Sequence, residues 1–343
     1  MNQVEIAKEL KVSQALISHI LNNPKTTRIP ESKKNEIFAF LKKSGYQHKR
    51  KKKTPLRRIA YITCLNIPEL YTDLYRPYML GVTEAAEAAS FEIVIKNYNQ
   101  DEASDIMEIN DVTGYIVQSA FIDRKPFFKK ENTVFVDNPF LGFDSVEPDN
   151  FRTIFLPMEY LVNKGHSKIA YWSMWNYGKR QNRSKHPEHL LNAFHFTLQE
   201  FGLKASEKYT YLPEAEKYNI QEIEENVIKF FRQWKTMKER PTAIITGDIY
   251  AIIMLKLAPE CGISVPDDLS IIGSDNIASC EFSNPPLTSI EQNRQEMGRL
   301  SIELLNARLN RPAASPKRLI CEPFLIERKS VTDIINREKT MKR

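Results

Sequence analysis

The chain is poor in glycine and cysteine, and it lacks the motifs on which several enzyme classes depend. Only 11 of its 343 residues are Gly, and neither a GxGxxG nor a Walker loop is present to cradle the phosphates of a nucleotide. A GxSxG turn, which would carry the nucleophile of an α/β-hydrolase, is missing as well. The four cysteines, Cys64, Cys261, Cys280 and Cys321, lie far apart and form no CxxC pair. This spacing predicts free thiols in a reducing cytoplasm.

Targeting and membrane signals are also missing from the sequence. The first ten residues, MNQVEIAKEL, have neither a basic start nor an apolar stretch, so no secretory signal peptide is expected. No run of 18 apolar residues occurs, which predicts that nothing spans a membrane. The composition, with 42% apolar and 27% charged residues, is ordinary for a globular protein, and the length predicts two or three domains. We therefore expect a cytoplasmic protein.

Charge is distributed unevenly along the chain. Residues 1–58 carry a net charge of +11, whereas the remainder carries −5. Much of the positive charge lies in HKRKKKTPLRR (48–58), a segment without any acidic residue. A basic N-terminal piece beside an acidic body predicts a polyanionic partner for that piece alone.

The first 47 residues predict three short helices. In VEIAKELKVSQALISHILNN (4–23), apolar residues recur at helical spacing in two stretches that are interrupted at residues 11–13. Ser13 is placed to cap the second helix, and the third is predicted to start at Pro30 and to end at Gly45. The buried face of the third helix is predicted to contain Ile37, Phe38 and Leu41.

Three helices with a tight turn between the first two indicate a helix-turn-helix. A small helical bundle that binds nothing is the alternative. The net charge of +11 favours the helix-turn-helix, because binding to DNA requires concentrated positive charge.

From residue 59 onward, short β-rich stretches alternate with helical ones. This alternation predicts an α/β body of two doubly wound parallel-sheet subdomains. Ligands of such folds bind at the carboxyl ends of strands, so the expected pocket lies between the two sheets. The predicted strands are 58–63, 91–98, 114–120, 133–138, 168–174, 209–212, 242–248 and 269–275, and the predicted helices are 76–90, 151–165, 187–202 and 220–234.

Several stretches, in order and spacing, resemble the lactose-repressor family of bacterial transcription regulators. In the N-terminal region these are VSQALISHILNN (12–23) and SGY (44–46). In the body they are VEPDN (146–150), LVNKGHSKIAYW (161–172), RPTAIITGD (240–248), CGISVPDDLSIIGSDN (261–276), PPLTSIEQNRQEMGRLSIELL (285–305) and PFLIERKSV (323–331). The resemblance covers about residues 3–331, and it rests on the order of the motifs more than on any one of them.

The resemblance implies an N-terminal helix-turn-helix followed by a body like a periplasmic sugar-binding protein. It further implies a homodimer that binds double-stranded operator DNA and a carbohydrate effector, with no cofactor, no metal site and no enzymatic activity. The domains expected are a helix-turn-helix at 1–47, a basic linker at 48–58, an effector-binding and dimerisation body at 59–331 and a tail at 332–343. Within the body, the N-subdomain is expected at 59–160 plus 292–317, and the C-subdomain at 161–291 plus 318–331.

In that family the second helix reads the major groove of DNA. The base-reading positions correspond here to Gln14, Ala15 and His19, since Gln can pair with adenine and His can contact guanine. Ser13 and Ser18 are expected to contact phosphates. The family usually has Arg at the position of His19, so we expect a different operator. Asn22, which is also in register with the family pattern, is a further candidate for DNA contact.

The linker departs from the family pattern, in which a hinge helix inserts a Leu into the minor groove. Here the Ala-Leu pattern is absent, Pro55 opposes a helix, and neighbouring like charges would repel one another along a helix. We therefore interpret the segment as a flexible basic tether that holds phosphates. Its candidate contacts are Lys49, Arg50, Lys51, Lys52 and Lys53.

The effector-binding candidates are carried over from the family by position. Acidic side chains at strand ends can accept hydrogen bonds from neighbouring hydroxyls, which suits a sugar, but each could instead be a helix cap or turn residue. The candidates are Leu74, Tyr75, Asp149, Leu190, Asp248, Asp275 and Arg294.

One of these positions departs from the family in a way that affects the ligand. The family places an Arg where this chain has Leu190, so a bidentate donor is missing. Either Arg180 or Arg183 substitutes for it, or the ligand differs in kind. Trp172 and Trp175 could stack on a sugar ring or belong to the core.

Other site types receive little support from the sequence. HPEH (186–189) with His195 has no zinc-type spacing and is interpreted as a surface loop leading into a helix. Asp267 and Asp268 are interpreted as a turn, and His166 as a structural residue. The sequence thus favours a DNA-binding transcription regulator, a repressor, with a sugar effector. Three alternatives stay open: a regulator that has lost its ligand, a solute-binding protein, and an enzyme on the same scaffold.

Overall fold

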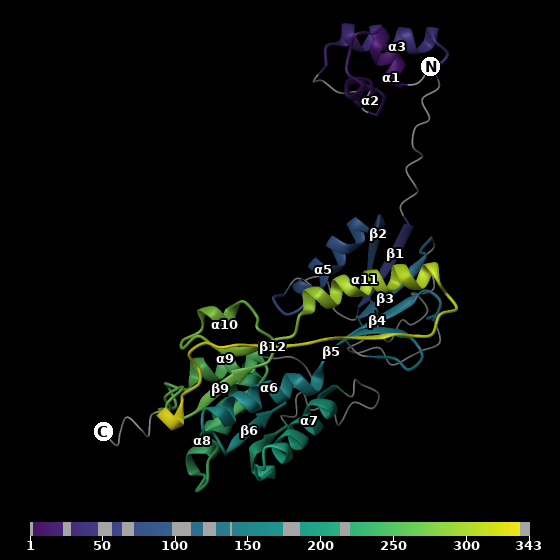
Figure 1. The fold of residues 1–343 in the computed structure, drawn as a ribbon. Helices are drawn as coiled ribbons and strands as arrows, with labels where there is room; N and C mark the ends of the chain where they lie inside the picture. Colours follow the sequence, from purple (N-terminus) through teal and green to yellow (C-terminus); the bar gives the residue numbers. More distant parts are fainter. Residues whose placement is uncertain are drawn as a thin grey trace. The chain divides into compact units, whose positions relative to one another are not determined.

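The computed structural model describes residues 3–22, 29–46, 57–63, 72–97, 111–118, 128–137, 139–173, 186–212 and 220–336. The chain divides into two compact units, Met1–Leu56 and Arg57–Arg343 (Figure 1).

The first unit contains three helices, α1 (Gln3–Glu9), α2 (Gln14–Asn22) and α3 (Glu31–Lys43). The Ser13 hydroxyl accepts a hydrogen bond from the Leu16 amide at 3.1 Å, which confirms it as the cap of α2. At the end of α3, Gly45 adopts a φ of 62°, and the Tyr46 amide donates to the Leu41 carbonyl at 3.1 Å, as in a Schellman motif.

The core of this unit is formed by one face of each helix. The expected role of Phe38 was wrong: its side chain is 38% exposed, and Phe40 packs against the core instead. Phe40 stands three residues after Ile37, on the same face of α3, whereas Phe38 is turned about 100° away. The buried apolar residues are Ile6, Ala7, Ile17, Ile20, Leu21, Ile37 and Leu41.

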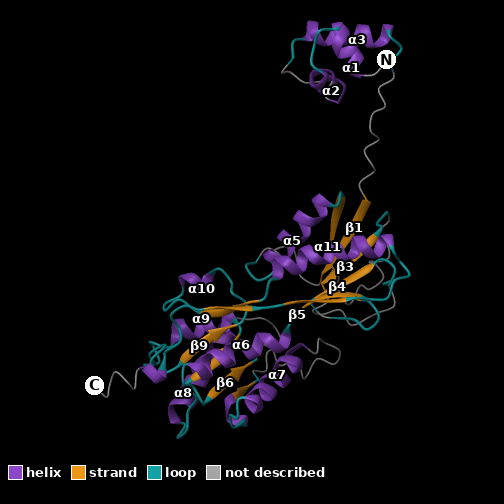
Figure 2. Cartoon of the chain, in the orientation of Figure 1, coloured by secondary structure: helices purple, strands orange, loops and turns teal. Residues whose placement is uncertain are grey.

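The second unit contains two six-stranded sheets (Figure 2). The first sheet, with its helices, is called the N-lobe. Its strand order is β11-β5-β4-β3-β1-β2, and every pairing is parallel. The strands are β1 (Arg57–Thr63), β2 (Phe91–Asn97), β3 (Gly114–Gln118), β4 (Thr133–Val136), β5 (Asp144–Pro148) and β11 (Arg318–Cys321).

Two helices, α5 (Arg76–Ala88) and α11 (Arg294–Asn310), cover one face of this sheet. They pack so closely that a Cβ on Gly81 would lie 1.9 Å from the Gln295 carbonyl oxygen. A Cβ on Gly298 would lie 2.2 Å from the Tyr78 carbonyl oxygen. Only glycine permits this approach of the two backbones.

The second sheet, with its helices, is called the C-lobe, and its order is β12-β10-β9-β8-β6-β7. Alternate residues of β6 face opposite sides: Ile169 and Tyr171 pack beneath α6 and α7, whereas Ala170 and Trp172 pack beneath α8 and α9. The strands are β6 (Ile169–Trp172), β7 (Thr210–Tyr211), β8 (Ala243–Thr246), β9 (Ser270–Gly273), β10 (Thr288–Glu291) and β12 (Phe324–Ile326). The helices are α6 (Asn150–Asn163), α7 (His186–Glu200), η3 (Glu207–Tyr209), α8 (Ile220–Thr236), α9 (Asp248–Leu257) and α10 (Ser279–Phe282).

The chain crosses between the lobes three times, after β5, after β10 and after β11. Each crossing leaves the carboxyl end of a strand and spans at most two residues. The carboxyl ends of β5 and β11 in the N-lobe therefore lie next to the carboxyl end of β10 in the C-lobe. This arrangement brings the ligand-binding edges of both sheets together.

These crossings confirm the two parallel-sheet subdomains but move three of the expected boundaries. Helix α6 belongs to the C-lobe and not to the N-subdomain, because its apolar face packs against β6 and α7. Strand β11 belongs to the N-lobe and not to the C-subdomain, because it pairs with β5 along its whole length. Arg57 and Arg58, expected in the linker, already pair with β2 as the first residues of β1.

Candidate binding sites

Helix α2 presents the three expected base-reading residues on its outer surface. Gln14, Ala15 and His19 are exposed, while Ile17 and Ile20 on the opposite side are buried in the helical core. A helix that is anchored on one side and polar on the other can enter a groove without disturbing its own packing.

The remaining DNA-binding candidates differ in how exposed their side chains are, and some are not described. Ser13 is exposed, although its hydroxyl already caps α2, and Ser18 is half-buried. The side chain of Asn22 and the tether residues 49–53 lie outside the described part of the chain.

Asp275 and Arg294 form a buried ion pair beside the second crossing. Asp275 follows β9 in the C-lobe, and Arg294 is the first residue of α11. The guanidinium donates from Nη2 to Asp275 Oδ1 at 2.5 Å and from Nη1 to the Asp275 carbonyl at 3.0 Å. Each residue is 7% exposed. Two of the predicted effector residues are therefore brought together, but they bind each other.

The N-lobe contributes a second carboxylate near this pair. The Tyr78 hydroxyl donates to Asp137 Oδ1 at 3.1 Å, and Asp137 directly follows β4. Burial alone would lower the pKa of Arg294, but electrostatic interactions, above all with the carboxylate of Asp275, raise it above its usual value. The guanidinium is thus a permanent cation between carboxylates of both lobes. Asp137 was missed from the sequence because it was counted as part of a strand.

Asp248 is completely buried at the start of α9. Its carboxylate accepts hydrogen bonds from the Ser289 hydroxyl at 2.6 Å, the Ile277 amide at 2.8 Å and the Cys280 thiol at 3.0 Å. Burial, and then the charge of Asp275, raise the pKa of Asp248 to about 6. The three internal donors favour the structural alternative, because Asp248 fastens the segment after β9 to α9 and β10.

Of the four further effector candidates, three have internal roles. Asp149 caps α6, with Oδ1 accepting from the Arg152 amide at 2.9 Å. Leu190 packs against the C-lobe core from α7. Leu74 and Tyr75 lie half-buried in the turn before α5, where Tyr75 also packs against the N-lobe core.

The structure decides between the alternative roles of some residues but not of others. Trp172 is buried in the core, with its ring 5.2 Å from that of Phe230, which favours its core interpretation. Trp175, Arg180 and Arg183 lie outside the described residues. His166 is structural, since its ring nitrogens contact the Thr242 hydroxyl at 2.9 Å and the Thr332 carbonyl at 3.1 Å.

The HPEH stretch (186–189) and the acidic pair Asp267 and Asp268 have local structural roles. HPEH opens helix α7 itself, so its assignment to a loop was wrong. Asp268 accepts a hydrogen bond from the Ser264 amide at 2.8 Å, which confirms the turn. Within the described ranges, no group of three or more His, Cys, Asp or Glu residues could hold a metal ion. Those ranges also contain no helix that is both long and apolar enough to cross a membrane.

Three strands of the two sheets end in a buried polar atom that has no hydrogen-bond partner in the described structure. These atoms are Gln118 Nε2 on β3, Trp172 Nε1 on β6 and Thr246 Oγ1 on β8. Buried polar groups are nearly always satisfied, so these three, out of six such atoms in the described residues, indicate places for ligand or water at strand ends. The sequence signal was available: each strand is apolar until its last residue, as in GYIVQ, IAYW and AIIT.

Comparisons with known proteins agree with this architecture. Residues 158–331, half of the chain, match the periplasmic binding protein-like domain family. The chain is 24% identical to the NTD biosynthesis operon regulator NtdR of Bacillus subtilis strain 168, over 98% of both chains. It is 25% identical to the HTH-type transcriptional repressor PurR of Yersinia enterocolitica, over 96% of both chains.

Solved structures show the same fold. The transcriptional regulator CelR in complex with cellobiose superposes with a TM-score of 0.67 and 19% identity, covering 96% of this chain and 99% of CelR. A LacI family transcriptional regulator from Enterococcus faecium with bound ribose superposes with a TM-score of 0.65 and 21% identity, covering 81% of this chain and all of the other. The chain therefore belongs to the periplasmic binding protein-like domain family.

Proposed function

We propose that this chain is a sequence-specific DNA-binding transcription repressor controlled by a small-molecule effector that binds where the two lobes meet. The observation that carries the proposal is the combination of an exposed Gln14, Ala15 and His19 face on α2 with a two-lobed body. In that body, unpartnered polar atoms lie at the carboxyl ends of strands. The proposed regulator acts by binding and not by catalysis, and it acts in the cytoplasm, where operator DNA is found.

The effector that fits best is a neutral polyhydroxy compound such as a mono- or disaccharide. Gln118 and Thr246 offer amide and hydroxyl groups, which bind neutral hydroxyls well. The relatives with bound cellobiose and ribose support the same class. A homodimer is expected, because a two-fold protein matches the two half-sites of an operator.

A specific observation also supports a second candidate, a repressor that responds to no ligand. Arg294 already occupies the carboxylate of Asp275, so a ligand must either displace the guanidinium or bind beside the pair. Without such a ligand the body would serve only to hold a dimer together.

Two measurements separate these candidates. Selection of bound duplexes from a random-sequence pool tests for operator recognition and yields the operator. Thermal unfolding of the full chain with sugars and with nucleosides then tests for an effector, because a ligand that binds only the folded state raises the Tm. A selected operator with no Tm shift for any compound would support the ligand-independent repressor. Failure to select any sequence would reject both.

A further inference from the structure

The strands of the N-lobe sheet begin along one face, which is called the strand-start face. Hydrogen bonds connect neighbouring strand starts across it. The Ser145 amide donates to the Lys317 carbonyl at 2.9 Å, and the Thr113 amide donates to the Arg58 carbonyl at 2.7 Å. Because β1 begins at Arg57, this face is also where the chain enters the body from the linker.

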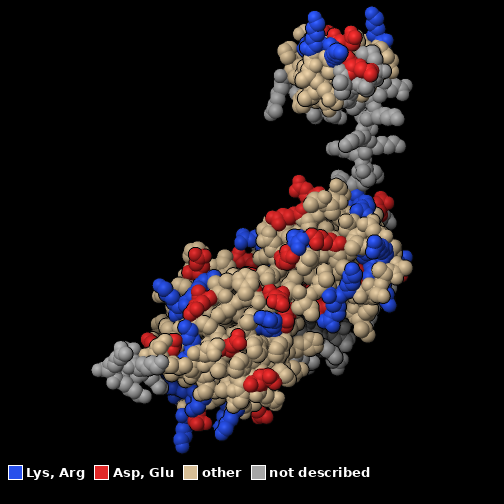
Figure 3. Space-filling model, viewed as in Figure 1, with Lys and Arg blue, Asp and Glu red and all other residues tan. Residues whose placement is uncertain are grey.

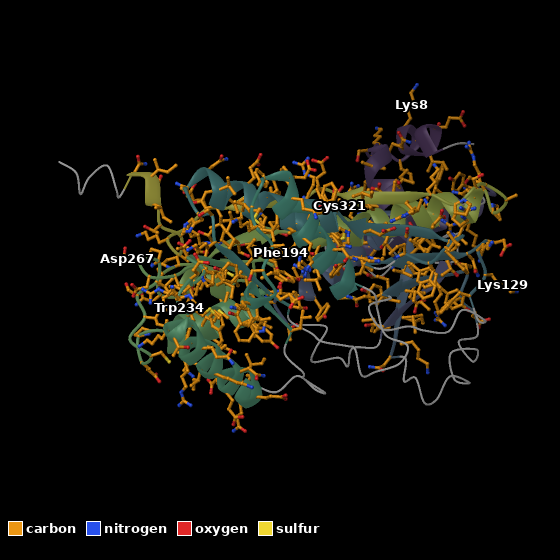
Figure 4. All side chains as sticks on the ribbon, turned by 90° about the horizontal axis from the view of Figure 1, so that it is seen from below. Lys8, Lys129, Phe194, Trp234, Asp267 and Cys321 are labelled. Carbon is orange, nitrogen blue, oxygen red and sulfur yellow. The ribbon has the colours of Figure 1, made fainter. Side chains whose placement is uncertain are left out.

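Four cations on the strand-start face are exposed and form no ion pair within the described residues: Lys129, Lys130, Arg311 and Lys317. Lys129 and Lys130 precede β4, and Arg311 and Lys317 lie in the loop between α11 and β11. Figure 3 shows Lys and Arg side chains gathered along the right-hand edge of this unit, beyond the end of α11. Figure 4 places Lys129 at the opposite end of the unit from Trp234 and Asp267.

Most acidic residues on this face are already paired. Glu92 pairs with Arg58 at 3.2 Å, and Asp144 pairs with Arg308 at 2.7 Å. Glu147 pairs with Arg318 at 2.5 Å. Among the loops that lead into these strands, Asp111 and Glu131 are the exposed acids that remain in the described structure. Among the described residues that precede β3, β4, β5 and β11, exposed cations without an ion pair therefore outnumber exposed acids without one.

We propose that the strand-start face is a second DNA-binding surface, which contacts the phosphates that flank the operator. The proposal rests on the proposed function, because the helix-turn-helix must first bring DNA to the molecule. It differs from base reading by α2, since exposed lysines contact phosphates without regard to sequence.

Covalent linkage is the reason to expect DNA, and not an acidic protein, at this surface. Residues 47–56 connect the last described residue of the helical part, Tyr46, to β1, and ten residues span at most about 35 Å when fully extended. DNA that is bound by the helix-turn-helix is thus held near the face at a high effective concentration. Duplex DNA presents one charge per roughly 1.7 Å of its axis, so phosphates are available wherever the face approaches it.

The test compares two lengths of duplex that carry the same selected operator. The short one contains only the operator, about 20 bp, and the long one adds about 15 bp of unrelated sequence on each side. The full chain should bind the long duplex more tightly and with a steeper dependence of log affinity on log salt. The variant Lys129→Ser/Lys130→Ser/Arg311→Ser/Lys317→Ser should lose this gain. Its salt slope on the long duplex should fall by up to about 3.6 per subunit, at roughly 0.9 per contact.

A matched control removes the same charge from the C-lobe, through Lys208→Ser/Lys229→Ser/Lys235→Ser/Lys238→Ser, all exposed positions. This control should keep the length-dependent gain, and both variants should bind the short duplex like the parent chain. If the strand-start variant retains the gain, or if both variants lose it equally, the second surface is rejected while the repressor function stands. If the parent chain prefers no operator at either length, the proposed function fails and the second surface fails with it.

Discussion

At the scale of single residues, the proposed base-reading role of α2 is tested at His19, which is exposed on that helix. We expect His19→Ala to reduce discrimination between the operator and a random duplex by about 1–3 kcal/mol. Non-specific affinity should persist, because the phosphate contacts are untouched. Titrations of both duplexes would measure the effect, with the exposed Asn35→Ala on α3 as the control. Equal loss on operator and random DNA would remove His19 from the reading face.

The Asp275–Arg294 pair raises a different problem at the same scale, because both residues are proposed effector contacts and are also paired with each other in the interior. Loss of one partner leaves a buried charge uncompensated, so Asp275→Asn or Arg294→Met should each cost about 3–5 kcal/mol of unfolding free energy. The double variant should cost clearly less than the sum of the two.

Denaturant titrations of the four proteins would measure this coupling. The double variant is then the suitable protein for a ligand test, because it remains folded without a carboxylate at position 275. If Asp275 binds the effector, the Tm shift caused by the ligand should disappear in it. A retained shift would place the effector elsewhere.

At the scale of secondary-structure elements, the packing of α5 on α11 fixes the position of Arg294 at the crossing. Gly81→Ala would push a methyl group into the Gln295 carbonyl, one residue from Arg294, and neither backbone can retreat without separating the helices. We expect a loss of about 3 kcal/mol in unfolding free energy, at the upper end of overpacking costs. Gly202→Ala is the control: it has a φ of 63° but open space around it, so about 1 kcal/mol is expected. Equal losses in denaturant titrations would show that the close approach is unimportant.

Elements also show where sequence reasoning succeeded. Every strand and helix expected in the body was found, because each has a clear apolar period. Strands β5, β10 and β11 and helices α9 and α11 were not expected. Strand β5 includes Asp144 and Glu147, whose partners Arg308 and Arg318 are more than 160 residues away. The membership of α6 and β11 was misjudged because it depends on which sheet they meet, and a local pattern does not contain that information.

At the scale of the whole molecule, the sequence predicted the location of the candidate site but not the hydrogen bonds within it. The sequence located the carboxyl ends of strands as the ligand edge, and the structure brings those of β5, β10 and β11 together. The sequence did not indicate that the Asp248 carboxylate would accept internal hydrogen bonds from Ser289, Ile277 and Cys280. Such pairing arises from contacts between segments that are distant in the chain. Polar residues that end apolar strands were the better guide to unpartnered groups.

The linker between the two units provides the remaining prediction, which rests on its sequence alone. Replacement of Lys49, Arg50, Lys51, Lys52 and Lys53 by Ser should weaken binding to every duplex by a similar factor. The slope of log affinity against log salt should fall by roughly 0.9 per lost phosphate contact in each subunit. Titrations on operator and scrambled duplexes at three salt concentrations would measure both quantities.

A hinge helix that inserts a side chain into the minor groove would behave differently, since its loss would harm the operator far more than random DNA. The tether also differs from the strand-start face in its dependence on duplex length. A tether that follows directly after the helix-turn-helix should contact even the short duplex, so its loss should affect short and long duplexes alike. An unchanged salt slope together with selective loss on the operator would overturn the tether and point to Leu56 as an inserting residue.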